Sequence, residues 1–302
     1  MQKMNKNGFS QCAGAYIERL RKEGRYSTAH VYKNALFSFS KFCGTWNISF
    51  RQVTRECLRC YGQHLYESGL KLNTVSTYMR MLRSIYNRGV DMHQAPYVHG
   101  LFRDVFTGVD TRQKKAIPIG ELHMLLNKDP QSEKLRRTQA IANLLFQFCG
   151  MPFSDLAHLE KSNLERGLLK YNRTKTGTPM SIEVLESAQN AIGGLYNKSD
   201  ARSSGYPDYL FRILSGAYKR NEEGAYREYQ SALRRFNNEL KSLSRKLRLH
   251  SPVTSYTLRH SWATTAKYRG VPIEMISESL GHKSIKTTQI YFCLLYTSPS
   301  PR

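Results

Sequence analysis

Apolar residues in the first ninety positions recur every three to four residues, which is the spacing of one face of an α-helix. The segments that carry such a stripe cover 11–22, 27–44, 54–69 and 73–89. Ser27 or Thr28 is expected to cap the second segment and Thr54 the third, while Gly89 is expected to end the fourth. The pattern therefore predicts a bundle of about four helices joined by short loops.

The helical pattern stops near residue 91, and a stretch with prolines, glycines and basic residues runs to residue 117. We interpret 108–117 as a linker between a helical domain at 1–107 and a second domain at 118–292. Lys114 and Lys115 in the linker are candidates for contacts with a nucleic-acid backbone. A solvated connector explains these lysines equally well, so both interpretations stay open.

The second domain mixes helical patterns with a pair of strands. Helices are expected over 141–148 and 226–247, where apolar residues again recur at helical spacing. Segments 168–175 and 179–184 flank a turn at Gly177 and predict a β-hairpin. The fold class is therefore mostly α with a small β-sheet, arranged as a helical bundle followed by an α+β domain.

Basic residues outnumber acidic ones by two to one, with 46 Lys and Arg against 23 Asp and Glu and a formal charge of +23. The excess is present in both halves of the chain, so each half could face a polyanion. Within the long helix, four basic residues are candidates for phosphate contacts, with a solvated helix face as the alternative. These candidates are Arg234, Arg235, Lys241 and Arg245.

Several classes of protein are disfavoured by the same sequence. Six irregularly spaced cysteines give no disulfide framework, and the lone pair Cys57 and Cys60 lacks the second pair that a structural zinc site needs. We therefore expect no metal and no other cofactor.

No apolar run reaches the length of a membrane span, and the polar first ten residues lack the core of a secretory signal. We expect a cytoplasmic protein without a membrane partner.

Two segments near the end of the chain combine residues that suit phosphate chemistry. Ser255 is expected to cap a helix whose first turn carries Tyr256 and Arg259 on one face, where the guanidinium and the helix dipole act on the same anion. His282 follows a helix-ending glycine, and Tyr291 comes nine residues later. RHSWAT followed by LGHKSIKTTQIY resembles the C-terminal signature of the tyrosine recombinase (phage integrase) family.

The resemblance implies a SAM-like core-binding domain followed by a catalytic domain, and a role for each matching residue. Tyr291 matches the nucleophile that forms a 3′-phosphotyrosine with DNA and releases a 5′-hydroxyl. Arg259 matches the second arginine of the family, and His282 the histidine that hydrogen-bonds the same phosphate. Lys175, in RTKTG, matches the lysine that protonates the leaving oxygen. Neither a metal ion nor ATP is implied.

The sequence departs from the family pattern at two positions. Pro152, in GMPFSDL, stands where the first family arginine is expected, although Asp155 keeps the acidic position that follows. Tyr256 stands where the family usually has histidine, and its reference pKa of about 10 makes it a poor base near neutral pH. A missing first arginine resembles the branch found on mobile elements and invertible promoters of Bacteroides-like bacteria.

Arg173 is a candidate for part of the missing role. It lies two residues before Lys175, and on a strand this spacing places both side chains on one face. The alternative is an exposed strand arginine that contacts only the DNA backbone.

The last ten residues, 293–302, read CLLYTSPSPR and resemble the translation of a sequencing adapter. We therefore expect them to carry no native structure or function, and the natural sequence after Phe292 to be different.

The sequence as a whole predicts a site-specific DNA recombinase, an integrase or invertase, that acts on double-stranded DNA as a homotetramer. Accessory DNA-bending or directionality proteins are possible partners. Two alternatives stay open: a decayed recombinase that only binds DNA, and a type IB topoisomerase.

Overall fold

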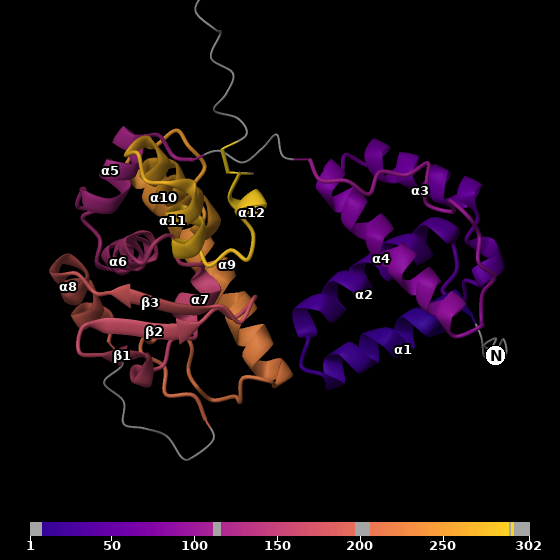
Figure 1. The fold of residues 1–302 in the computed structure, drawn as a ribbon, viewed down its shortest axis with the longest axis horizontal. Helices are drawn as coiled ribbons and strands as arrows, with labels where there is room; N and C mark the ends of the chain where they lie inside the picture. The colour runs from indigo at the N-terminus through magenta and orange to yellow at the C-terminus, as the bar shows by residue number, and fades with distance from the viewer. Residues whose placement is uncertain (1–7, 111–115, 197–205, 290, 293–302) are drawn as a thin grey trace, which may run out of the picture. The chain divides into compact units, whose positions relative to one another are not determined.

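The computed structural model describes residues 8–110, 116–196, 206–289 and 291–292. The chain divides into two compact units, 1–110 and 111–302. Figure 1 shows the helices and strands of each unit in chain order. Lys114, Lys115 and the segment 293–302 lie outside the described residues. Among the helices in the described ranges, none is both long enough and apolar enough to cross a bilayer.

The first unit is helical, as predicted. Its elements are α1 (Phe9–Lys22), α2 (Tyr26–Cys43), the short 3₁₀ helix η1 (Phe50–Gln52), α3 (Arg55–Glu67) and α4 (Leu72–Asp91). Aromatic rings form much of its core: the Phe39 ring meets Phe9 at 6.0 Å and Tyr61 at 5.0 Å between centroids, in edge-to-face geometry. Rings packed in this way stabilise the bundle beyond the area that they bury.

Two expected helix ends in this unit were wrong. Ser27 and Thr28 lie inside α2 rather than at its cap, since the helix begins at Tyr26. Gly89 lies inside α4, which continues to Asp91, and a Cβ atom at this position would collide with the Phe50 ring. The glycine therefore allows a close helix contact instead of ending the helix.

The chain after α4 stays attached to that helix through residue 110. Ser76 Oγ donates to the carbonyl of Gly108 at 2.6 Å. The Asn73 side chain both donates to the carbonyl of Asp110, at 2.7 Å, and accepts from its N–H, at 2.8 Å. Residues 108–110 are thus held by side chains of α4.

The second unit is a helical domain with a three-stranded sheet. Its elements are α5 (Ile119–Asn127), α6 (Glu133–Gln147), α7 (Phe153–Ala157), η2 (Lys161–Asn163), β1 (Leu164–Glu165), β2 (Leu168–Asn172), β3 (Pro179–Glu183), α8 (Glu186–Leu195), α9 (Glu223–Lys246), α10 (Ser255–Tyr268), α11 (Ile273–Ser279) and α12 (Ile285–Gln289). The strands are antiparallel in the order β1-β2-β3, and the register pairs Leu169 with Ile182 and Asn172 with Pro179. The predicted hairpin is present, whereas β1 was not predicted.

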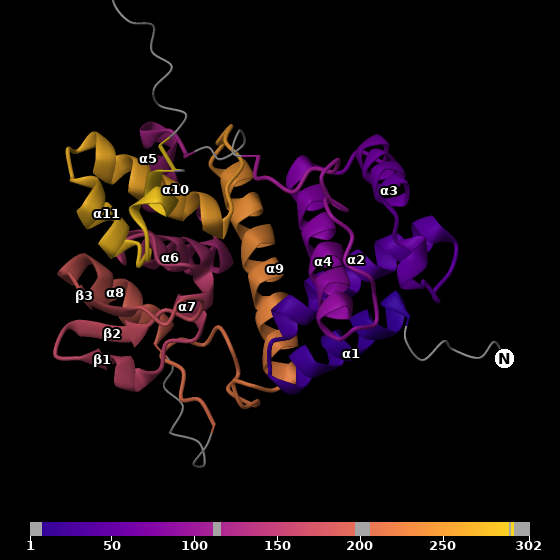
Figure 2. The same cartoon turned by 45° about the vertical axis from the view of Figure 1, so that its right-hand side comes forward.

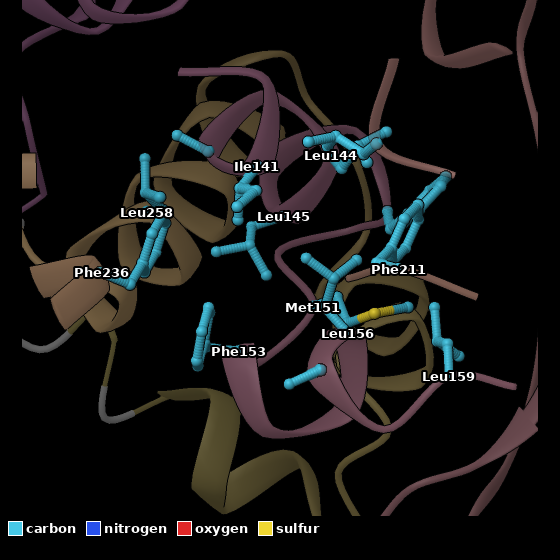
Figure 3. Packing of buried hydrophobic residues seen from close by; sticks show 14 of the residues in the cluster. Ile141, Leu144, Leu145, Met151, Phe153, Leu156, Leu159, Phe211, Phe236 and Leu258 are labelled. Atoms are coloured by element: carbon cyan, nitrogen blue, oxygen red, sulfur yellow. The ribbon is translucent and has the colours of Figure 1, made fainter. Parts of the chain in front are cut away.

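The core of the second unit joins helices that lie far apart in the sequence. Leu144 and Leu145 of α6, Leu156 of α7 and Leu258 of α10 are fully buried in one cluster. Figure 3 shows these side chains together with Phe153 and Phe236, whose rings stack at 4.7 Å. This packing fixes the start of α7 and the first turns of α10 within one rigid core.

The last helices form a smaller cluster with residues of α10. Phe292 is buried beside Ala263 and Ala266 of α10 and Leu280 at the end of α11. Figure 2 shows α10 and α11 lying side by side. The segment that carries Tyr291 is therefore anchored to α10 through its neighbour Phe292.

Candidate active site

Arg259 lies in the first turns of α10, and its side chain is only 3% exposed. The helix is capped by Thr254, whose hydroxyl accepts from the Thr257 N–H, and not by Ser255 as expected. The guanidinium of Arg259 donates from Nη1 to the Gly150 carbonyl at 2.9 Å and from Nη2 to the Leu280 carbonyl at 2.5 Å. Backbone acceptors from two distant segments thus fix its orientation.

Arg173 lies beside Arg259 and is also buried, with 7% of its surface exposed. Its Nη1 atom donates to the carbonyls of Leu280 and Gly281, so both guanidinium groups share the Leu280 carbonyl. Arg173 does not share a strand face with Lys175, contrary to the prediction, because β2 ends at Asn172 and Arg173 begins the connection that follows. Arg173 is buried while Lys175 is exposed, so the alternative of an exposed strand arginine is excluded as well.

Asp155 and Gly281 make the buried position of Arg173 possible. The Asp155 carboxylate accepts from Arg173 Nε at 3.2 Å and from the Thr174 N–H at 3.1 Å, and it is 3% exposed. Gly281 has a φ of 62°, and a Cβ atom there would collide with the Arg173 side chain. A buried pair of this kind needs other hydrogen bonds to replace lost hydration, and the backbone carbonyls of Leu280 and Gly281 provide them here for Arg173 Nη1.

His282 lies at the end of the α11 segment and faces Arg259. Its Nε2 atom is 3.1 Å from Arg259 Nη2, and its Nδ1 atom is 2.8 Å from the Thr288 hydroxyl. Because a guanidinium only donates, Nε2 accepts and the proton sits on Nδ1, which donates to Thr288. Burial, followed by the charges of Arg259, Arg173 and Lys175, lowers the pKa of His282 to about 4. The imidazole is therefore neutral at pH 7 while the site holds no anion.

Tyr291 follows α12, and its ring lies against two histidines. Its centroid is 4.2 Å from the ring of His260 and 5.6 Å from that of His282. Its hydroxyl is 3.2 Å from the hydroxyl of Tyr256, and the His282 imidazole near its ring lies 3.1 Å from Arg259 Nη2. The phenol and the buried arginine thus belong to one cluster, with His282 between them.

Burial shifts the pKa values of two groups in this cluster, Arg259 and Tyr256. The pKa of Arg259 is lowered by burial from its ordinary value, an effect that the Tyr291 hydroxyl opposes. The pKa of Tyr256 is raised by burial and by the neighbouring Tyr291 hydroxyl, although half of its side chain remains exposed. Tyr256 is therefore a hydrogen-bonding neighbour of Tyr291 rather than a base.

Lys175 and Pro152 lie at the edge of this cluster. Lys175 is exposed in the turn between β2 and β3, and its charge contributes to the lowered pKa of His282. Pro152 caps α7, where its carbonyl accepts from the Asp155 N–H at 3.0 Å, but it has no N–H to offer a phosphate. Pro152, which stands in place of the missing arginine, thus stabilises the first turn of α7, which carries Asp155.

The remaining candidates for DNA contacts are on α9. Arg234, Arg235, Lys241 and Arg245 are all exposed on this helix. The structure does not join them to the cluster around Arg259.

Sequence reasoning missed several groups that build the site. Thr288 is fully buried and orients His282, but no spacing rule connects the two residues. The carbonyls of Gly150 and Leu280 bind the guanidinium groups, and backbone acceptors leave no trace in a sequence pattern. His260 was visible beside Arg259 in the RHSWAT segment, although nothing in the sequence assigned it a contact.

Sequence comparisons match both units. The profile of the Phage integrase family matches residues 119–297, and that of the Phage integrase SAM-like domain matches residues 9–97. Tyrosine recombinase XerD of Halalkalibacterium halodurans is 29% identical over 256 residues, covering 80% of this chain and 78% of the relative. Tyrosine recombinase XerC of Bacillus pumilus is 26% identical over 293 residues, covering 91% and 89%.

Solved structures show the same fold at low sequence identity. The Tn1549 transposon integrase in complex with a circular intermediate DNA matches with a TM-score of 0.66 and 14% identity, over 94% of each chain. A lambda integrase dimer bound to a core site matches with a TM-score of 0.64 and 13% identity, over 96% of this chain and 98% of that one. With the family profile covering more than half of its length, this chain belongs to the phage integrase family of tyrosine recombinases.

Proposed function

We propose that this chain is a site-specific DNA recombinase, an integrase or invertase, which cuts and rejoins DNA through a 3′-phosphotyrosine intermediate. The observation that carries the proposal is the cluster in which the Tyr291 ring lies 5.6 Å from the ring of His282, whose Nε2 atom is 3.1 Å from the buried Arg259 guanidinium. A nucleophile held beside an immobilised cation is the arrangement that phosphoryl transfer requires. The family profile and the DNA-bound structures of similar fold support the same assignment.

In the proposed reaction, Tyr291 Oη forms a bond to a DNA phosphorus while the bond from that phosphorus to the 5′-oxygen breaks. The phenol passes its proton through the neighbouring Tyr256 hydroxyl to water, and Lys175 gives one to the departing oxygen, so a 5′-hydroxyl is released. A 5′-hydroxyl of a second strand then attacks the phosphotyrosine and frees Tyr291. The ester conserves the energy of the broken bond, so the exchange needs no added energy source.

Arg259 would bind the non-bridging oxygens on which negative charge accumulates. Its orientation is already set by two backbone carbonyls, so little reorganisation is needed when the phosphate arrives. Preorganised donors of this kind usually supply the largest electrostatic contribution to catalysis.

His282 would change its role when DNA binds. Without an anion its Nε2 accepts from Arg259 and cannot donate to a phosphate. A bound phosphodiester brings negative charge next to the ring, which raises the pKa of the imidazole. The protonated ring could then donate from Nε2 to the phosphate while Nδ1 still donates to Thr288. Tyr256, which lies beside the Tyr291 hydroxyl, would relay a proton rather than act as a base.

Arg173 would take part of the role of the missing first arginine. It lies 7% exposed beside Arg259 and shares the Leu280 carbonyl with it. Within the described part of the chain, its Nη2 atom has no hydrogen-bond partner and could donate to a phosphate. Arg173→Lys keeps the charge but loses this extra donor, so we expect slower cleavage. Cleavage at the rate of the parent in Arg173→Lys and Arg173→Ala, with Arg259→Ala impaired, would remove Arg173 from the mechanism.

The decisive experiment is covalent capture of DNA. A pool of nicked duplexes with randomised arms is incubated with the full chain, and protein linked to DNA is recovered after denaturation and sequenced. We expect protein attached to 3′ ends, lost in Tyr291→Phe and retained in Tyr268→Phe, an exposed tyrosine of the same unit. Salt-dependent binding without any adduct would favour the second candidate, a decayed recombinase that only binds DNA.

The finer assignments extend this proposal. We place a core-binding domain at 1–107, a linker at 108–117 and the catalytic domain at 118–292. The active form would be a homotetramer on double-stranded DNA, in the cytoplasm of a bacterium and associated with its nucleoid. The lambda integrase tetramer bound to a Holliday junction, matched with a TM-score of 0.63, is an example of this assembly in a protein of similar fold.

Two further points concern lineage and partners. Pro152 in place of the first arginine supports an origin in the Bacteroides-type branch of mobile elements and invertases. Accessory DNA-bending or directionality proteins would decide between integration, inversion and excision. A type IB topoisomerase would form the same adduct, but it would relax supercoiled DNA without joining two sites.

A further inference from the structure

His260 is buried at the centre of a cluster of aromatic rings. Its side chain is 3% exposed, and it follows Arg259 on α10. Its ring centroid lies 4.2 Å from that of Tyr291, at an interplanar angle of 34°. The Tyr256 ring meets it edge-on, at 4.7 Å and 83°. One imidazole therefore contacts both phenol rings whose hydroxyl groups are hydrogen-bonded to each other.

The backbone near Tyr291 provides little restraint of its own. The helix before it, α12, has five residues, and the Tyr291 N–H makes a single turn bond to the Thr288 carbonyl at 3.0 Å. Phe292 anchors the chain in the small apolar cluster, but it does not fix the side-chain torsions of its neighbour. Tyr291 itself packs partly buried against this cluster, and its ring also contacts His260 and, more distantly, His282.

Adjacent residues of α10 thus serve the two partners of the proposed reaction. Arg259 would bind the phosphate, and His260 packs against the ring that carries the attacking oxygen. Because the two are consecutive in one helix, that helix would couple the position of the nucleophile to that of the phosphate. A displacement of about 1 Å in such a site can cost about 100-fold in rate.

We infer that His260 is a positioning residue, which holds the Tyr291 ring so that its hydroxyl is directed at the phosphate that Arg259 would bind. This inference rests on the proposed function. The positioning role requires only that a planar ring packs at position 260. The imidazole of His260 transfers no proton in this role.

The test compares three variants at this position by single-turnover formation of the covalent adduct on a nicked duplex captured by the parent chain. We expect His260→Ala to slow the reaction by about 10- to 100-fold, with DNA affinity almost unchanged. His260→Phe, which restores a ring, should recover most of the rate. His260→Gln fills more of the site than alanine but carries no ring, and it should remain slow. His250→Ala, an exposed histidine of the same unit, serves as the control.

A second measurement detects the environment of the Tyr291 ring directly and does not depend on catalytic activity. In protein labelled with 3-fluorotyrosine, the ¹⁹F resonance of Tyr291 is identified by its loss in Tyr291→Phe. Removal of the imidazole should shift and narrow this resonance in His260→Ala, while His250→Ala leaves it in place. Thermal melting of each variant verifies that the fold is intact.

The outcomes separate the two proposals. A parent chain that captures no duplex overturns the proposed function, and the fluorine spectra still decide whether His260 holds the ring. Adduct formation by His260→Ala at the rate of the parent, or an unmoved Tyr291 resonance, overturns the positioning role. A His260→Phe variant as slow as His260→Ala, with an altered pH profile, would assign chemistry to the imidazole and overturn it as well.

Discussion

The two units of this protein bury different kinds of side chain. The core of the first unit is built from rings and aliphatic groups, such as Phe39 and Tyr61, and the ion pairs among its described residues lie at the surface. The second unit buries Asp155, Arg173 and Arg259 next to one another. Both units carry an excess of basic residues, so composition alone does not distinguish them.

The difference shows which charges are held in place for function. Removing a charge from water has a large unfavourable free energy unless other groups replace the lost hydration. In the second unit, the carbonyls of Gly150, Leu280 and Gly281 provide that replacement. A surface arginine needs no such support, but its position is also not fixed. Fixed cations suit the stabilisation of charge in a transition state, whereas mobile ones suit general attraction of DNA.

The largest effect on stability is expected from Arg173→Ala, which leaves the buried Asp155 carboxylate without its cation. Breaking a buried pair in this way typically lowers the free energy of unfolding by about 3–5 kcal/mol. Urea denaturation of the parent and the variant measures the change. The double variant Arg173→Met with Asp155→Leu should recover much of the loss, because no unpaired charge remains. A change below about 1 kcal/mol in Arg173→Ala would contradict the buried pair.

The next effect concerns rate. We expect Arg259→Ala to slow adduct formation by about 10² to 10³-fold, since it removes a preorganised donor to the phosphate. Single-turnover capture on a nicked duplex gives the rate. Arg234→Ala on α9 is the matched control: it removes an exposed arginine and should weaken DNA binding with little change in the rate at saturation. Equal rates of adduct formation for the two variants would contradict the expectation that buried arginines contribute more to catalysis than exposed ones.

A smaller effect is expected from pH. The pKa of His282 is lowered to about 4 in the folded protein, mainly by burial, against about 6.5 in an unfolded chain. The unfolded state therefore binds more protons between these values, and the free energy of unfolding should fall as the pH falls from about 6.5 to 4. His282→Gln should remove this part of the slope, as measured by denaturation at several pH values. An unchanged slope would show that His282 is not shielded from water.

The smallest effect is expected at the surface of the first unit. Arg59 pairs with Glu56 at 2.7 Å, but the two side chains are 63% and 66% exposed. Solvent and salt screen such a pair, so Arg59→Ala should leave the urea midpoint within experimental error. A clear loss of stability would mean that surface pairs of the first unit contribute as much as the buried pair of the second.

Local sequence patterns predicted most of the fold, and they failed where a distant contact decided the outcome. Gly89 was expected to end α4, but the Phe50 ring packs against it and the helix continues. Strand β1 has only two residues, which is too short for an alternating pattern to appear in the sequence. It is defined by its pairing with β2. Arg173 was expected on a strand face, but β2 ends one residue before it.

By itself, the sequence determined the helical character of the first unit, the hairpin of the second and the segments that carry Tyr291, Arg259 and His282. These features depend on neighbours along the chain, through helical spacing, turn residues and short motifs. Only the tertiary structure decided that Arg173 pairs with Asp155, that both guanidinium groups share the Leu280 carbonyl, and that His260 packs against Tyr291. Those contacts join segments far apart in the sequence. Many of the partners are backbone carbonyls or aromatic rings, which occur at many positions, so the sequence does not show which of them makes the contact.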